Sequence, residues 1–281
     1  MSRSTRSASA LLLAALLAGC GDTTVLEPMA APSSGPSRII NGTFDSNSLY
    51  PAVGALAFDY RQNGLTGDDE WCTGSLISPT VFLTAAHCVI TRYTPPGSQF
   101  YVSFAPDLYA KNAKFIPAVT YYADPQYGHD QANLHDLAVI ILPEGSTKGL
   151  TPYRLPTRGE LDALSAQGGL NNAIFINVGY GVSATRTGVP DFPYDGKRSY
   201  SESEFMGLQP YWLGLLMNEN ATGLGGDCYG DSGGPKFLKT NPGVVYATVT
   251  TGDYVCRATS WDYRTDTDDA RAFLGQFVTL R

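Results

Sequence analysis

Short apolar runs separated by turn-forming residues are the feature that most limits what this chain can fold into. Five such runs, rich in Val, Ile, Phe and Tyr, lie at residues 52–58, 100–104, 137–142, 173–178 and 244–249. Clusters of Gly, Pro, Asn and Asp separate them, in a chain with 30 glycines and 18 prolines. Runs of this kind are typical of β-strands. The pattern therefore predicts an all-β fold, either a sandwich or a barrel.

One helix is expected close to the C-terminus. Its apolar residues recur with the period of a helix and follow Asp268 and Asp269, which favour a helix start. The apolar stripe consists of Ala270, Phe273, Leu274, Phe277 and Leu280.

The first 19 residues have the pattern of an export signal. Arg3 and Arg6 precede a Leu/Ala run at residues 10–18, which is shorter than the about 20 apolar residues needed to span a bilayer. Such a run fits a signal peptide. It ends in Leu17-Ala18-Gly19-Cys20, which resembles the lipobox of bacterial lipoproteins. The resemblance implies that Cys20 carries diacylglycerol, which supplies the two acyl chains that a stable membrane anchor needs. An ordinary secretory signal that ends in a cysteine by chance is the alternative.

Residues 20–38 differ in composition from the rest of the chain. They are rich in Thr, Pro, Ser, Ala and Gly, so they can bury little apolar surface and are expected to form a flexible tether. The change comes abruptly at Arg38-Ile39-Ile40-Asn41-Gly42. We therefore expect a signal peptide at 1–19, a lipidated tether at 20–38 and a folded domain at 39–281.

Charge and cysteine usage narrow the function further. The formal net charge is -7 and no basic run is present, which argues against a nucleic acid partner. If Cys20 is modified, the other four of the five cysteines can form two disulfides. No Cys and His group has metal-ligand spacing, so we expect no metal or cofactor. The acidic segment 68–70 is interpreted as a solvated turn rather than a calcium site.

Three local motifs carry chemistry when they are taken together. The first is Thr84-Ala85-Ala86-His87-Cys88, which Trp71-Cys72-Thr73-Gly74-Ser75-Leu76 precedes. The second is Asp136 followed by Leu137-Ala138-Val139-Ile140, and the third is Cys228-Tyr229-Gly230-Asp231-Ser232-Gly233-Gly234-Pro235. Together they resemble the trypsin/chymotrypsin family, from Ile39 to the final helix. The resemblance implies two packed six-stranded antiparallel β-barrels with a catalytic cleft between them, and a serine endopeptidase that acts on proteins or peptides.

The residue types fit that activity. A serine hydroxyl such as that of Ser232 attacks only when a base takes its proton, and the imidazole of His87 titrates in the useful range. A buried Asp136 would hold the imidazole in the right tautomer. The backbone N–H groups of Gly230 and Ser232 would bind the oxyanion, and glycine at 230 leaves the backbone free to turn.

Chain order and context decide between alternatives. Residues 230–234 also satisfy Gly-x-Ser-x-Gly, but α/β-hydrolases need a histidine after the serine, and the three histidines, at 87, 129 and 135, all precede Ser232. For the acid, Asp136 is preferred to Asp130 because it opens an apolar strand. His129 and His135 are expected at the surface.

The resemblance also implies disulfides and an activation site. Cys72 would pair with Cys88, and Cys228 with Cys256, which would brace the substrate pocket. Cleavage after Arg38 would free the α-amine of Ile39 to pair with Asp231. Because no cysteine links the tether to the domain, cleavage would also release the protease from the cell envelope. We thus expect an exported monomer that is bound to the membrane until it is activated.

Substrate preference remains open at this point. The acid of trypsin-like members corresponds to Gly226 here, and the next residue is Asp227. Basic substrate residues are expected if Asp227 or Asp262 points inward, and small or medium apolar ones if Trp261 fills the pocket. The substrate-binding residues predicted from the resemblance are Gly226, Asp227, Tyr229, Thr250, Thr251 and Gly252. An inactive protease-like binding protein and an esterase with the same triad are the alternative functions.

Overall fold

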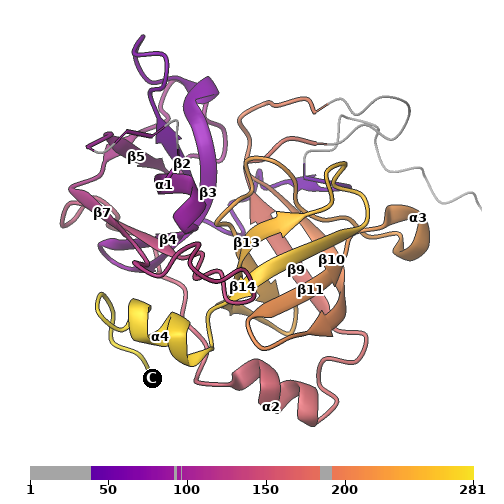
Figure 1. The fold of residues 1–281 in the computed structure, drawn as a ribbon. Helices are drawn as coiled ribbons and strands as arrows, with labels where there is room; N and C mark the ends of the chain where they lie inside the picture. Colours follow the sequence, from indigo (N-terminus) through magenta and orange to yellow (C-terminus); the bar gives the residue numbers. More distant parts are fainter. Residues whose placement is uncertain (1–38, 92–93, 96, 184–191) are drawn as a thin grey trace, which may run out of the picture. The chain divides into compact units, whose positions relative to one another are not determined.

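The computed structural model describes residues 39–91, 94–95, 97–183 and 192–281 (Figure 1). The expected signal peptide at 1–19 and the tether at 20–38, with Cys20 and Arg38, lie outside the described residues. Within the described part, no helix combines the length and the apolar character needed to cross a bilayer.

The C-terminal half forms a closed antiparallel barrel. Strand order is β1-β10-β11-β14-β13-β12-β9, and an additional β10–β9 pairing closes six of the strands into a ring. The strands are β1 (Thr43–Phe44), β9 (Ile174–Gly179), β10 (Ser199–Leu208), β11 (Trp212–Leu216), β12 (Pro235–Leu238), β13 (Asn241–Gly252) and β14 (Thr259–Arg264).

The N-terminal half forms a second antiparallel sheet of seven strands, in the order β6-β5-β2-β3-β4-β8-β7. No pairing among the described residues joins its two edge strands, so it is a half-barrel where we expected a closed one. The all-β chymotrypsin-like fold itself is confirmed. The strands are β2 (Val53–Phe58), β3 (Glu70–Ser78), β4 (Val81–Thr84), β5 (Phe100–Ser103), β6 (Ile116–Pro117), β7 (Thr120–Ala123) and β8 (Ala138–Ile141).

Helices are short and few. The C-terminal helix α4 (Asp268–Leu274) begins as expected, because the side chain of its N-cap Thr267 accepts from the Ala270 N–H. It ends before the predicted stripe does, although Phe277 still packs against the core. The remaining helices are the 3₁₀ turn η1 (Gly67–Asp69), α1 (Ala86–Val89), α2 (Glu160–Ala166) and α3 (Glu219–Thr222).

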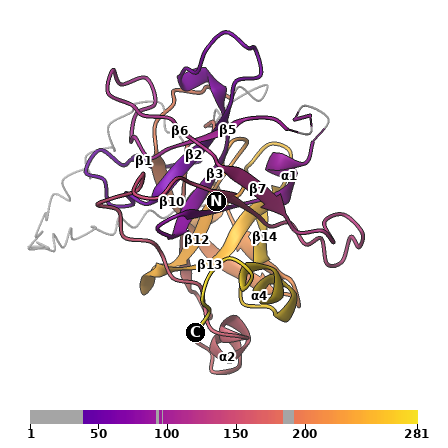
Figure 2. The ribbon, with the colours of Figure 1, turned by 90° about the vertical axis from the view of Figure 1, so that its left-hand side faces the viewer.

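The two sheets and α4 share one apolar core. Val53 and Val139 from the N-terminal sheet lie in the same buried cluster as Ile176 and Phe237 from the barrel and Phe273 from α4. Figure 1 shows the two sheets next to each other, and in Figure 2 the yellow α4 lies below β13 and β14. All five apolar runs that indicated strands lie in β2, β5, β8, β9 and β13. This shared core fixes the cleft residues that the two sheets contribute.

Candidate active site

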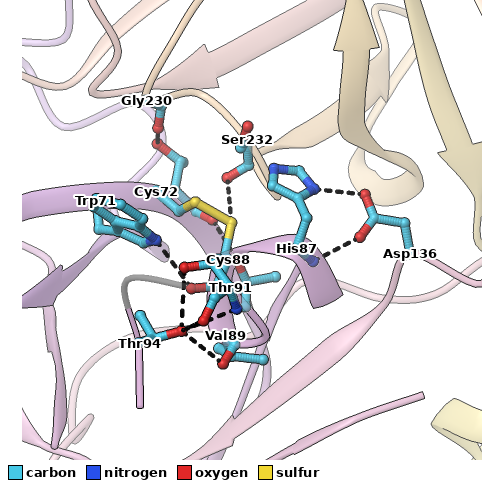
Figure 3. The surroundings of a disulfide bond; sticks show 12 residues. Trp71, Cys72, His87, Cys88, Val89, Thr91, Thr94, Asp136, Gly230 and Ser232 are labelled. Carbon is cyan, nitrogen blue, oxygen red and sulfur yellow. Dashed lines mark hydrogen bonds and ion pairs between the residues drawn. A yellow bond between two sulfur atoms is a disulfide. The ribbon is translucent and has the colours of Figure 1, made fainter. Parts of the chain in front are cut away.

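His87 and Asp136 are brought together by the pairing of β4 with β8. The ladder aligns Thr84 with Ala138, so the turn after β4, which carries His87 on α1, meets the residues just before β8. His87 Nδ1 lies 2.7 Å from Asp136 Oδ2, and the His87 backbone N–H donates to Oδ1 at 2.9 Å (Figure 3). Both carboxylate oxygens are therefore used to hold one histidine.

Burial and charge act in opposite directions on His87. Burial lowers the pKa of His87, whereas the charge of Asp136 and the hydrogen bond to it raise that pKa, and the net shift is upward. Asp136 is fully buried, whereas the His87 side chain is 30% exposed. The imidazole can thus be reached from solvent while its partner cannot.

The other His and Asp residues lie elsewhere. Asp130 is exposed and accepts from the Ala132 N–H, and His129 is also exposed. His135 differs from the expectation, because its Nδ1 lies 3.2 Å from Asp124 Oδ2 and its side chain is only 15% exposed. It is a half-buried residue of a second His–Asp pair, not a surface residue.

Ser232 lines the same cavity as His87. Figure 3 shows the His87 ring with Asp136 on one side and Ser232 on the other. No described residue hydrogen-bonds the Ser232 hydroxyl, while the Ser232 carbonyl accepts from the Thr73 N–H at 2.9 Å. The backbone of the serine is therefore fixed to β3 of the N-terminal sheet, and its hydroxyl remains free to react.

The loop before Ser232 requires glycine at position 230. Gly230 has a φ of 95°, and a Cβ there would lie 2.9 Å from Gly181 Cα. The N–H groups of Gly230 and Ser232 have no acceptor among the described residues. Both amides, on either side of Asp231, are therefore left to donate to a further acceptor.

Asp231 points away from the cavity into a cradle made by two glycines. Its Oδ1 accepts from the Gly181 N–H and its Oδ2 from the Cys228 N–H, both at 2.8 Å. A Cβ at Gly179 or Gly181 would clash with its carboxylate. Burial, followed by the nearby charge of Asp227, raises the pKa of Asp231 to about 7. A cation beside this carboxyl would therefore stabilise its ionised form.

The residues after the expected cleavage point lie within the barrel half. Ile39 is fully buried. The Ile40 N–H donates to the Gly226 carbonyl at 3.0 Å, and the Gly226 N–H donates to the Ile40 carbonyl at 3.1 Å. The chain at 39–40 is therefore paired to the segment that precedes Asp231.

Both disulfides predicted from the resemblance are present. Cys72 pairs with Cys88 and Cys228 with Cys256. The sulfur atoms of the first pair lie close to His87 in a group of potential metal ligands, but sulfurs joined to each other are not thiolates and do not bind a metal as such. The second disulfide lines the cavity, as expected.

Glu70 was missed by the sequence reasoning. A Cβ at Gly230 would lie 3.1 Å from Glu70 Oε2, so this carboxyl adjoins the loop that carries Gly230 and Ser232. Its Oε1 is buried and accepts no hydrogen bond within the described residues. Burial, together with the charge of Asp231, raises the pKa of Glu70 well above its usual value. The interpretation of 68–70 as a solvated turn holds for the exposed Asp68 but is wrong for Asp69, which is buried, and for the carboxyl of Glu70.

The cavity contains most of the predicted substrate residues. They are Asp227, Tyr229, Thr250, Thr251 and Gly252, with Met217 and Val249 beside them. Gly226 does not line it, because a Cβ there would lie 2.1 Å from Met217 Sδ, so the methionine already covers that position. Trp261 packs on Gly214 of β11 instead of filling the cavity.

Comparisons with known proteins agree with this fold. The family model that describes trypsin matches residues 39–268. A collagenase from Hypoderma lineatum is 28% identical over 218 residues, which is 72% of each chain. The solved structure of HL collagenase superposes with a TM-score of 0.62 at 20% identity, covering 86% of this chain and all of that one. Human heparin binding protein gives 0.61 at 17% identity, over 85% and 96% of the two chains. The chain belongs to the trypsin family of chymotrypsin-like serine proteases.

Proposed function

We propose that the chain is a serine endopeptidase in which His87, Asp136 and Ser232 form the catalytic triad. The observation that carries the proposal is the contact of the His87 imidazole with one oxygen of a fully buried Asp136, whose other oxygen accepts from the His87 backbone N–H, on a cavity that Ser232 also lines. A buried carboxylate fixes the tautomer in which Nδ1 bears the proton, which leaves Nε2 as the base.

The reaction follows from these groups. Ser232 Oγ forms a bond to the scissile carbonyl carbon while its proton passes to His87 Nε2. The amides of Gly230 and Ser232 donate to the oxygen that gains negative charge. The intermediate collapses, the C–N bond breaks, and the leaving amine takes the proton from Nε2. Water then attacks the acyl-enzyme by the same route and releases the acid and free Ser232.

The proposal includes a zymogen. Cleavage after Arg38 would give Ile39 an α-amine, and Asp231 would be its partner. Support comes from the burial of Ile39 and from the raised pKa of Asp231, which marks a buried carboxyl that would gain from a cation. Forming that ion pair would order the loop that carries Gly230 and Ser232.

The location of the protein at the cell envelope is also part of the proposal. A lipid on Cys20 would hold the precursor at the cell envelope, and cleavage after Arg38 would free the domain. Active enzyme that begins at Ile39 and stays in the membrane fraction after a high-salt wash would contradict this part of the proposal alone.

A fluorophosphonate probe tests the catalytic proposal. The mature enzyme should label once, and Ser232→Ala should abolish labelling, whereas Ser165→Ala, at an exposed serine on α2, should label as the wild type does. Turnover of casein beyond that of small esters supports an endopeptidase over an esterase. Absence of labelling in a folded chain that begins at Ile39 would leave the binding protein as the better interpretation.

A further inference from the structure

Two acids line the cavity, and the first is fully occupied by backbone. Asp253 Oδ1 accepts from the N–H groups of Ala258 at 2.7 Å and Thr259 at 2.9 Å, and both of its oxygens accept from the Arg257 N–H. A carboxylate with this many donors shapes its own turn and has little capacity left for a ligand.

The second acid, Asp227, is occupied by a lysine. Lys236 lies on β12, two residues after Gly234, and is fully buried. Its Nζ contacts Asp227 Oδ2, while Asp227 Oδ1 accepts from the Ser260 hydroxyl at 3.1 Å. Lys236 does not itself line the cavity. The acid that faces the substrate therefore already has a cation inside the barrel.

Lys236 is held as a cation by the barrel interior. Its Nζ donates to Asn177 Oδ1 at 2.7 Å and lies 3.6 Å from Asp262 Oδ1, so all three of its protons have an acceptor nearby. Burial lowers the pKa of Lys236, but the negative charges of Asp227 and Asp262 raise it by more, so the net shift is upward. The ammonium keeps its charge.

Asp262 does not line the cavity. It is fully buried, its Oδ1 lies 3.6 Å from Lys236 Nζ, and burial raises its pKa. Of the two acids in the lining, only Asp227 is left to meet a charge on the substrate, and Lys236 cancels the charge of Asp227.

The rest of the wall is largely apolar. Met217 and Val249 line it together with the Cys228–Cys256 disulfide, and Tyr229 and Tyr254 lie at 46% and 75% exposure. An arginine or lysine of a substrate would leave water and approach a buried ammonium with no free acid to pair with.

We propose that Lys236 is a specificity-determining residue, which neutralises Asp227 from inside the barrel so that the cavity takes an uncharged side chain before the scissile bond. This rests on the proposed endopeptidase activity. It selects the apolar alternative left open by the sequence, for a different reason, since Lys236 neutralises Asp227 from behind the lining and Met217 forms part of the wall, whereas Trp261 does not.

The test uses the mature enzyme and peptides that differ only in the residue before the scissile bond. We expect kcat/KM for Leu or Phe to exceed that for Arg by about tenfold or more, because the buried cation has no free counter-charge to offer. Lys236→Met should raise the Arg-to-Leu ratio by about tenfold or more, because Asp227 then lacks its cation.

Three variants separate this role from a structural one. Lys236→Arg should keep the low Arg-to-Leu ratio, and so should Lys239→Met, which removes a nearby lysine that is 52% exposed. The third is the double variant Lys236→Met/Asp227→Asn, which leaves no uncompensated buried charge. It should return the Arg-to-Leu ratio to its low value, because the carboxylate that Lys236→Met uncovers is gone.

The outcomes separate the two proposals. A wild-type enzyme that labels with fluorophosphonate and prefers Arg or Lys, or a Lys236→Met/Asp227→Asn variant whose Arg-to-Leu ratio is as high as that of Lys236→Met, overturns the role of Lys236 and leaves the endopeptidase intact. A folded chain beginning at Ile39 that neither labels nor cleaves any peptide overturns the endopeptidase, and the role of Lys236 with it.

Discussion

Two buried carboxylates act on the same cavity, Asp227 as part of its lining and Asp136 through His87, and their surroundings give the two acid–base pairs opposite properties. Asp136 holds an imidazole that is 30% exposed, whereas Asp227 holds an ammonium that is fully buried. An imidazole gains and loses a proton near neutral pH. Lys236, enclosed by acceptors, keeps its proton and serves as a fixed charge. The difference shows that the identity and exposure of the base, more than the acid, decide whether a pair moves protons.

The largest effect should come from the pair that moves protons. Asp136→Asn should lower kcat by about 10⁴-fold near neutral pH, because the imidazole loses the acceptor that fixes its tautomer. The matched control is Asp124→Asn, at the second His–Asp pair, which should leave kcat almost unchanged. Steady-state kinetics on one peptide measures both, and equal losses in the two variants would remove Asp136 from the triad.

The Lys236–Asp227 pair, whose charges are fixed, should affect the stability of the fold instead. Lys236→Met should lower the free energy of unfolding by about 3–5 kcal/mol, because it leaves Asp227 buried without its cation. Adding Asp227→Asn should recover part of that loss, since the uncompensated charge is gone. Lys239→Met removes an exposed ion pair and should cost about 0–1 kcal/mol. Urea unfolding gives all three values, and additive losses in the double variant would refute the pairing.

The pH dependence of activity distinguishes the two bases. His87 must be neutral to accept a proton, and its pKa is raised from 6.5, so activity should fall as the pH drops, with a midpoint above that value. Below the midpoint, kcat/KM should decrease about tenfold per pH unit. Lys239→Met should leave the midpoint where it is, and so should Lys236→Met. A midpoint that moves with Lys236 would mean that the two pairs are coupled.

The sequence predicted the first pair and missed the second for a physical reason. His87, Asp136 and Ser232 each lie in a motif whose residues are consecutive, and the strands around them were visible as apolar runs. Lys236 is a single polar residue on a short strand, and its partners Asp227, Asn177 and Asp262 come from three other segments. Only the closure of the barrel brings them together, so burial of the lysine has no local signal.

Other departures have the same origin. His135 was expected at the surface, but the fold places Asp124 beside it. Helix α4 ends at Leu274 although the apolar stripe continues to Leu280, and the chain goes on in single turns, in which the Gln276 N–H donates to the Phe273 carbonyl and the Val278 N–H to the Leu274 carbonyl. The closed C-terminal barrel and the open N-terminal sheet could not be told apart from strand content, since closure depends on one strand pairing.

The smallest effect should come from Glu70, a third buried acid, for which the described residues supply no histidine or lysine partner. Glu70 keeps a raised pKa because of burial and the charge of Asp231, so in the folded state it holds a proton that the unfolded chain releases above about pH 4.5. As the pH rises from about 4.5 towards the raised pKa of the folded state, the unfolded chain is therefore increasingly favoured. Glu70→Gln should match the wild type in stability at acid pH and exceed it slightly at neutral pH, while Glu144→Gln, at an exposed carboxylate, should change neither. Urea midpoints over a pH series measure this. A Glu70→Gln variant that is less stable than the wild type at neutral pH would mean that Glu70 is ionised and paired. Glu70 would then resemble Asp136 and Asp227 instead of differing from them.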